Sequence, residues 1–230
     1  MFVSVETIDA VTVVGIDRPP ANAMSLELLD ELVDALEQLA ADVPAALVIA
    51  GRAGFFSAGV DLGAVPGYGP DEQRRMVTGI NRMVIATYGL SCPVIAAVTG
   101  HAIAGGLVLA LCADLRIASL QGRYGLTEVK VGVPYPQAAI GVVKAELPPP
   151  AARRLALSNE LIDGAEALRL GLFDEALEPD QVRARAVELA VETAAFPADI
   201  YAATKRELRG QTLAGITTAV ETEPLLKRWL

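Results

Sequence analysis

The chain has 230 residues and a formal net charge of −9, and 53% of its residues are hydrophobic. That length can bury one substantial core, so we expect a single domain. The acidic balance argues against nucleic acid or an anionic membrane as a partner. The sequence contains no apolar run near the roughly 20 residues that a membrane helix needs, and residues 1–6 lack the zones of a signal peptide. We therefore expect a soluble, cytoplasmic protein.

Strand and helix patterns alternate from the first residues onward. Apolar and polar residues alternate over 2–8 and 11–17, which predicts a hairpin that turns at Asp9 and Ala10. Ser25 stands where it can cap the following helix. The apolar positions of that helix recur with the helical period: Leu28, Leu29, Leu32, Val33, Leu36 and Leu39. A short apolar run over 46–50 then predicts a buried strand.

The alternation continues through the middle of the chain. We expect a helix over 71–90, a strand over 94–98, a short apolar helix over 105–112 and a strand over 115–118. This order favours an α/β sheet with crossover helices. Residues 149–230 contain successive helical stretches interrupted by glycine and proline, so we expect a helical C-terminal region.

Two glycine-rich segments follow predicted strands. The first spans 51–62 and the second spans 100–107, where it opens the short apolar helix. Glycine allows backbone conformations that bring N–H groups close to a ligand. The first N–H groups of a helix also lack internal partners and carry the positive end of the helix dipole. Two such turns after neighbouring strands can together hold one developing oxyanion.

The two segments, FSAGVDL at 56–62 and GHAIAGG at 100–106, resemble the paired signatures of the crotonase, or enoyl-CoA hydratase/isomerase, superfamily. The residues TEV at 127–129 and GVP at 132–134 extend the match. RPPANAM at 18–24 resembles the early turn with which this family contacts CoA. The resemblance implies a crotonase (ClpP/crotonase-like) fold, with a twisted sheet and crossover helices.

The resemblance also implies how the chain is divided and what it binds. Residues 1–176 form the α/β core with the acyl-CoA site, and residues 177–230 form a helical oligomerisation region. The substrate is an acyl-CoA thioester and the assembly is a homotrimer or a dimer of trimers. Coenzyme A enters as part of the substrate, so we expect no separate cofactor and no metal.

Site residues follow from the resemblance position by position. The oxyanion-hole N–H groups fall on Val60 and Gly105, and the acid/base residue falls on Glu128. The remaining substrate or CoA contacts are Arg18, Ala21, Ala23, Ser57, Ala58, Gly59, Asp61, Leu62, Ala104, Val108 and Tyr135. The sequence leaves open whether Tyr135 lines the acyl pocket or packs against the turn.

The sequence departs from the family pattern at one acid/base position. Members commonly carry two glutamates, but Val108 stands at the first position and only Glu128 remains. Adding water across a double bond is work that two carboxylates share, whereas one carboxylate can move a proton between two carbons. The pattern therefore favours a Δ3-Δ2 enoyl-CoA isomerase. The alternatives are another crotonase-type reaction, such as weak hydration or decarboxylation, and a non-catalytic acyl-CoA binder.

Some polar residues are expected to have structural roles. Ser57 and His101 suggest a hydrolase, but the glycine before Ser57 lies one position too early for a Gly-x-Ser-x-Gly elbow. We expect His101 to pack beside the glycine turn and Asp61 to cap backbone amides. Cys92 and Cys112 are expected to be buried thiols.

The charged residues near and after the sheet are expected to play no part in the chemistry. Asp114 and Arg116 are predicted to form an ion pair. Lys205, Arg206, Lys227 and Arg228 could approach CoA phosphates, but basic residues on helices usually face solvent, and they are left out of the site.

Overall fold

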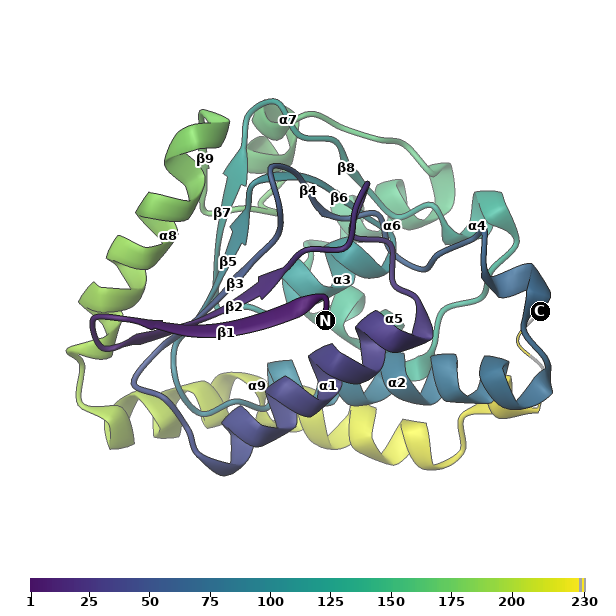
Figure 1. Cartoon of the computed structure of the whole chain (residues 1–230), viewed down its shortest axis with the longest axis horizontal. Helices are drawn as coiled ribbons and strands as arrows, with labels where there is room; N and C mark the ends of the chain where they lie inside the picture. The colour runs from purple at the N-terminus through teal and green to yellow at the C-terminus, as the bar shows by residue number, and fades with distance from the viewer. Residues whose placement is uncertain (228, 230) are drawn as a thin grey trace.

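The computed structural model describes residues 1–227 and 229. A six-stranded sheet forms its centre, with strand order β1-β2-β3-β5-β7-β9 (Figure 1). β1 and β2 form the predicted antiparallel hairpin, and the other neighbours are parallel. The strands are β1 (Val3–Ile8), β2 (Val11–Ile16), β3 (Leu47–Ala50), β5 (Val94–Val98), β7 (Leu115–Ser119) and β9 (Glu175–Leu177). The expected α/β sheet with crossover helices is confirmed.

A second, three-stranded sheet of order β4-β6-β8 lies beside the first. Its strands are β4 (Gly54–Ser57), β6 (Gly100–Ile103) and β8 (Tyr124–Gly125). The strands β3, β5 and β7 each lead into one strand of this small sheet. We did not predict it, because its strands are short and two of them lie in segments that the glycine pattern marks as turns. The pairing of β4 with β6 brings the two glycine-rich segments side by side.

Helices cover both faces of the central sheet. They are α1 (Leu26–Ala41), α2 (Pro70–Tyr88), α3 (Gly105–Leu111), α4 (Glu128–Val131), α5 (Gln137–Glu146), α6 (Pro149–Ser158), α7 (Gly164–Arg169), α8 (Pro179–Ala194) and α9 (Ala198–Glu221). Short 3-10 helices span Val65–Gly67 and Pro224–Leu226. Ser25 caps α1 as predicted, because its hydroxyl accepts a hydrogen bond from the N–H of Leu28 at 3.3 Å.

The two faces of the sheet have separate hydrophobic cores. Figure 1 shows α8 on one side of the sheet, and α1 and α2 on the other. Val182, Ala186 and Ala190 of α8 pack against side chains of β2, β3, β5 and β7. The larger core joins the opposite face to α1, α2, α3 and α5. No helix within residues 1–227 is long and apolar enough to cross a membrane.

The region after residue 149 is not made of helices alone. β9 belongs to the central sheet, so the expected boundary between 176 and 177 falls inside a strand. α8 covers one face of that sheet, and α9 packs on α5, where Ile216 meets Gly141. Sequence periodicity could not reveal β9, because it has only three residues, all of them half-buried.

The predicted ion pair between Asp114 and Arg116 is wrong. Asp114 instead accepts from Lys205 Nζ at 2.7 Å and pairs with Arg209 at 3.0 Å, because α9 brings both cations to it. Arg116 pairs with Glu146 at 3.3 Å. The expectation that Lys205 faces solvent is also wrong, since it is buried.

The other predicted structural residues behave as expected where the structure describes them. Arg206 and Lys227 are exposed, while Arg228 lies outside the described residues. Cys92 and Cys112 are free and buried. Burial raises the pKa of Cys92 to about 11 and that of Cys112 to about 12, so both thiols stay protonated at neutral pH.

Candidate active site

The early turn is fixed against β4 by one buried amide. Asn22 donates through Nδ2 to the carbonyl oxygens of Ile16 (2.8 Å) and Phe56 (3.1 Å). Its Oδ1 accepts from the N–H of Arg18 at 2.7 Å, and its carbonyl oxygen accepts from the hydroxyl of Ser57 at 2.7 Å. Because Asn22 is fully buried, these bonds fix the position of the segment that leads to Val60.

The two glycine-rich turns touch through their backbones. Gly59 has φ of +77°, and a Cβ atom there would lie 2.9 Å from Ala104 Cβ and 3.0 Å from Gly105 N. A Cβ atom on Gly105 would lie 3.7 Å from Gly59 Cα. The carbonyl of Gly59 accepts from the N–H of Met24 at 2.7 Å, which holds the turn in place. Only glycine at position 59 permits this close approach.

Two backbone N–H groups from these turns border one cavity. Val60 and Gly105 both line it, and no hydrogen bond within the described part of the chain uses either N–H group. Gly105 is the first residue of α3, where helical N–H groups have no partner in the helix. Ala104 before it has φ of 52° and ψ of −126°, a conformation that costs free energy outside glycine. This strained residue sets the direction of the Gly105 N–H.

Glu128 lines the same cavity from α4. It is the first residue of this single helical turn, which closes with Gly132 at φ of +74° and a 2.9 Å bond from the N–H of Val133 to the carbonyl of Glu128. Its side chain is buried, with 8% of the residue exposed. Burial raises the pKa of Glu128 above its usual range, because the charged form loses water.

The hydroxyl of Tyr135 lies near the Glu128 carboxylate. Its proximity lowers the pKa of Glu128, but by less than burial raises it. Neither Tyr135 Oη nor Glu128 Oε2 has a hydrogen bond of normal geometry, although both atoms are buried. Glu128 is therefore a buried carboxyl group that lacks a hydrogen-bond partner at Oε2. Tyr135 packs against the core rather than along the cavity lining.

The cavity is small and mostly apolar. Its volume is about 60 Å³. Besides Val60, Gly105 and Glu128, its lining comprises Ala58, Leu62, Ile80, Ala104, Thr127, Val131, Val133, Pro134, Pro136 and Trp229. Glu128 is thus the single ionisable side chain among the described lining residues.

Two predicted contact residues have side chains with no exposed surface. Ser57 is fully buried, where its hydroxyl donates to Asn22 and accepts from the N–H of Gly59 at 3.1 Å. Val108 is fully buried in α3. Neither side chain is among those that line the cavity. Ser57 positions the first amide-bearing turn, and Val108 packs in the core behind the site.

The other predicted contacts lie around the cavity. Arg18 Nη2 pairs with Asp61 Oδ2 at 2.8 Å, and Arg18 Nη1 donates to the carbonyl of Ala23 at 2.9 Å. Asp61 Oδ1 accepts from the N–H of Gly63 at 3.1 Å, so Asp61 caps a backbone amide as predicted. Ala21 is half-buried on the same early turn, where its carbonyl accepts from the N–H of Ala58.

His101 has a packing role, as expected. Its Nδ1 accepts from the N–H of Arg123 at 2.9 Å, and its ring packs edge-on against Phe55 at 4.7 Å. With the hydroxyl of Ser57 buried, the two residues do not form a hydrolase pair. Within the described ranges, no cluster of three or more histidine, cysteine or acidic side chains could hold a metal ion.

Sequence analysis missed three residues that shape the site. Asn22 lies inside the RPPANAM segment at 18–24. A polar side chain between two alanines was the feature of the sequence that could have revealed it. Ile80 and Trp229 reach the cavity from α2 and from the segment after α9. Trp229 is the only tryptophan, yet it lies in the region that we assigned to oligomerisation.

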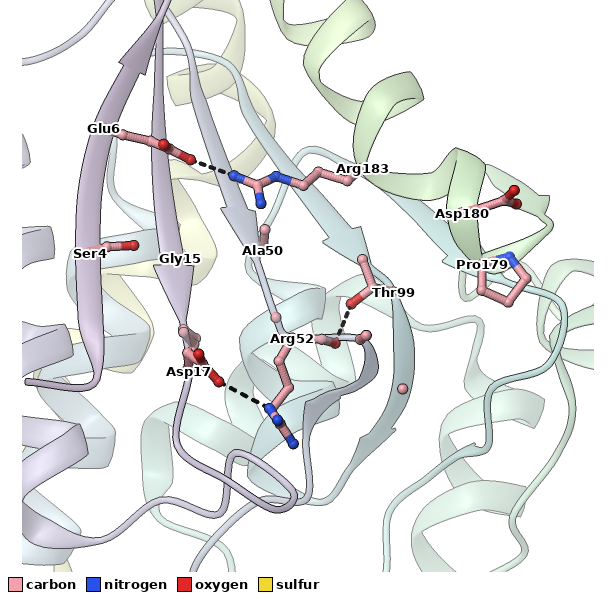
Figure 2. Close-up of a pocket in the computed structure, with 14 residues that line it drawn as sticks. Ser4, Glu6, Gly15, Asp17, Ala50, Arg52, Thr99, Pro179, Asp180 and Arg183 are labelled. Atoms are coloured by element: carbon pink, nitrogen blue, oxygen red, sulfur yellow. Dashed lines mark hydrogen bonds and ion pairs between the residues drawn. The ribbon is translucent and has the colours of Figure 1, made fainter.

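A larger, open hollow of about 750 Å³ lies elsewhere and shares no lining residue with the Glu128 cavity. Figure 2 shows two ion pairs in it, Arg183 with Glu6 and Arg52 with Asp17, and Asp180 at its edge. The carbonyl of Arg52 also accepts from the hydroxyl of Thr99 at 2.8 Å. Because each arginine is paired with a carboxylate, the described lining offers no unpaired cation for an anionic ligand.

Known proteins resemble this chain along most of its length. The family model described as enoyl-CoA hydratase/isomerase matches residues 6–226. The chain belongs to this family. Its curated relatives include a human protein named enoyl-CoA delta isomerase 1, mitochondrial, which is 30% identical over 90% of this chain and 70% of its own length. A putative enoyl-CoA hydratase from Thermus thermophilus is 33% identical, over 96% of this chain and 88% of its own length.

Solved structures of family members share the fold. A probable enoyl-CoA hydratase, EchA3, from Mycobacterium tuberculosis has a TM-score of 0.90 and 30% identity, over 96% of this chain and 94% of the other. Human mitochondrial delta3-delta2-enoyl-CoA isomerase has a TM-score of 0.86 and 29% identity, over 95% of this chain and 87% of the other. Family members with similar folds thus carry both isomerase and hydratase names.

Proposed function

We propose that this protein is a Δ3-Δ2 enoyl-CoA isomerase in which Glu128 is the only acid/base residue. One observation carries the proposal: among the described residues that line the cavity, Glu128 is the single ionisable side chain, beside the unpaired N–H groups of Val60 and Gly105. Such a site can stabilise a negative oxygen and move a proton, but its described lining offers no second carboxylate to activate water.

The reaction uses these three groups in sequence. The thioester oxygen accepts hydrogen bonds from the N–H groups of Val60 and Gly105. Glu128 takes a proton from C2, and the electron pair moves through the carbonyl to give a dienolate with negative charge on that oxygen. Glu128 then returns the proton to C4, and the double bond moves from C3–C4 to C2–C3. Coenzyme A takes part only as the carrier of the acyl group.

The environment of Glu128 suits this work. A raised pKa makes the carboxylate a stronger base and lets it keep the proton until the dienolate takes it back. The small apolar lining limits the water that could compete for that proton.

Hydration is the second candidate, because some relatives are named hydratases. Two further alternatives are another reaction of the crotonase type, such as decarboxylation, and acyl-CoA binding without catalysis. Against hydration stands Val108, which is apolar and fully buried where the family pattern has a second glutamate. A buried, poorly partnered Glu128 argues against a mere binder, since such a carboxyl group costs stability.

Replacing Glu128 tests the proposal. Glu128→Gln should lower turnover of 3-enoyl-CoA by roughly 10² to 10⁴-fold, the size expected for loss of a general base. Affinity for CoA esters should stay within about tenfold, because the amides and the cavity remain. Glu27→Gln, at an exposed position on α1, serves as the matched control. Near-normal turnover by Glu128→Gln would refute the assignment.

A further inference from the structure

Trp229 closes part of the cavity that holds Glu128. Its indole is buried, with 4% of the residue exposed, and lines the cavity with the two amides and Glu128. Its Nε1 donates to the carbonyl of Pro134 at 3.2 Å. Trp229 is the largest side chain of the lining. It therefore decides how much room remains for an acyl chain.

A buried polar network holds the segment that carries Trp229. Glu223, which is 4% exposed, accepts from Asn81 Nδ2 at 3.0 Å and from the N–H of Gln137 at 2.7 Å. Asn81 Oδ1 accepts from the N–H of Ala138 at 3.1 Å. These side chains satisfy the first N–H groups of α5, for which Pro136 provides no side-chain cap. The same carboxylate accepts from the N–H of Leu225 at 3.2 Å.

The network and the indole join the segment after α9 to the cavity wall. Asn81 follows Ile80, and Gln137 follows Pro136, and both Ile80 and Pro136 line the cavity. Buried networks that are fully satisfied rigidify their surroundings. The indole is thus held from two sides, by Pro134 at its nitrogen and by Glu223 at the start of its segment.

We infer that Trp229 is the residue that limits acyl-chain length, and that the site favours a short acyl group over a long one. This inference rests on the proposed function. The cavity is small, about 60 Å³, and the buried indole is the largest side chain in its wall. Longer chains must displace the indole, which breaks its bond to Pro134. Removing the indole opens the apolar side of the cavity to longer chains.

The test compares turnover of four-, six-, eight- and ten-carbon 3-enoyl-CoA by the wild type and two variants. Trp229→Ala should raise the ratio of kcat/KM for ten carbons over four carbons by at least roughly tenfold, since each methylene in an apolar pocket discriminates by that order. Trp229→Phe keeps most of the side-chain volume but loses the hydrogen bond to Pro134. Its ratio of kcat/KM for ten carbons over four carbons should therefore stay nearer that of the wild type. Leu157→Ala removes an exposed apolar side chain on α6, outside the cavity lining, and should leave this ratio of kcat/KM values unchanged.

Binding provides a second readout that does not depend on turnover. Isothermal titration calorimetry serves both proteins, because Trp229 is the only tryptophan and Trp229→Ala therefore has no tryptophan fluorescence. Titration of each protein with butyryl-CoA and decanoyl-CoA should show tighter binding of the short ester by the wild type and a reversed order for Trp229→Ala. If binding follows this pattern while no 3-enoyl-CoA is converted, the isomerase proposal fails and the length limit stands. A folded Trp229→Ala protein with an unchanged chain-length profile in binding, or a wild type that binds both esters equally, would overturn the inference.

Discussion

At the scale of single residues, the burial of Glu128 links the proposed chemistry to stability. Its raised pKa means that the folded protein holds this proton more tightly than the unfolded chain, whose glutamate pKa is 4.5. Stability is therefore lost as pH rises through the folded pKa, because Glu128 must ionise inside the cavity. Below the unfolded pKa both states are protonated and no cost remains.

This linkage predicts how Glu128→Gln affects unfolding. The variant should have a higher Tm than the wild type at neutral pH, because it removes a buried charge. The difference should shrink toward zero as the pH approaches about 4, near the ordinary glutamate pKa. Thermal unfolding across this pH range measures it. A variant less stable than the wild type at neutral pH would mean that the Glu128 carboxylate has a stabilising partner.

The residues of the site differ in how far sequence could reveal them. Glu128, Val60 and Gly105 belong to short local motifs, so their roles could be predicted and the structure brings them to one cavity. The roles of Asn22 and Trp229 depend on contacts with residues far away in the chain. Their residue types alone do not reveal those contacts.

At the scale of elements, the first residue of α3, Gly105, supplies one of the two N–H groups of the proposed oxyanion hole. Gly105→Pro removes the N–H group, and we expect activity to fall by at least roughly 10²-fold, the size seen when one oxyanion donor is lost. Gly105→Ala keeps the N–H, and its Cβ would lie 3.6 Å from Met24 Sδ in ordinary contact, so it should remain active. Circular dichroism must show that both variants are folded. A folded and fully active proline variant would contradict the proposed hole.

The elements themselves were predictable where periodicity is long. α1 and α2 lie where their apolar patterns place them, since one face of each must be buried. β5 lies where a continuous apolar run predicts a strand, and it is buried on both faces. The strands β4, β6, β8 and β9 were not predicted, because they have two to four residues and pair with strands distant in sequence. The small sheet nevertheless places the two amide-bearing turns together.

At the scale of the whole molecule, we propose that the chain assembles as a homotrimer or a dimer of trimers through residues beyond α8. Phe196, Ile200 and Leu208 are large apolar side chains that remain exposed in the single chain, and Leu208 is 79% exposed. Light scattering should give the mass of three or six chains, and Leu208→Glu should lower it by placing a charge in the interface. Val5→Glu on β1 adds the same charge elsewhere as a control. A monomeric wild type would refute this assembly.

The central claim is that Glu128, acting alone, moves a proton between two carbons of an enoyl-CoA but does not add water to its double bond. The most direct measurement follows the wild type by absorbance with a 3-enoyl-CoA and with the 2-enoyl-CoA of the same chain length. The first should be converted to the conjugated 2-enoyl-CoA, and isomerisation should exceed hydration by at least roughly 10²-fold, the contribution of a missing acid/base partner. Hydration of the 2-enoyl-CoA at a rate comparable to isomerisation would contradict the account and show that another group replaces the glutamate absent at Val108.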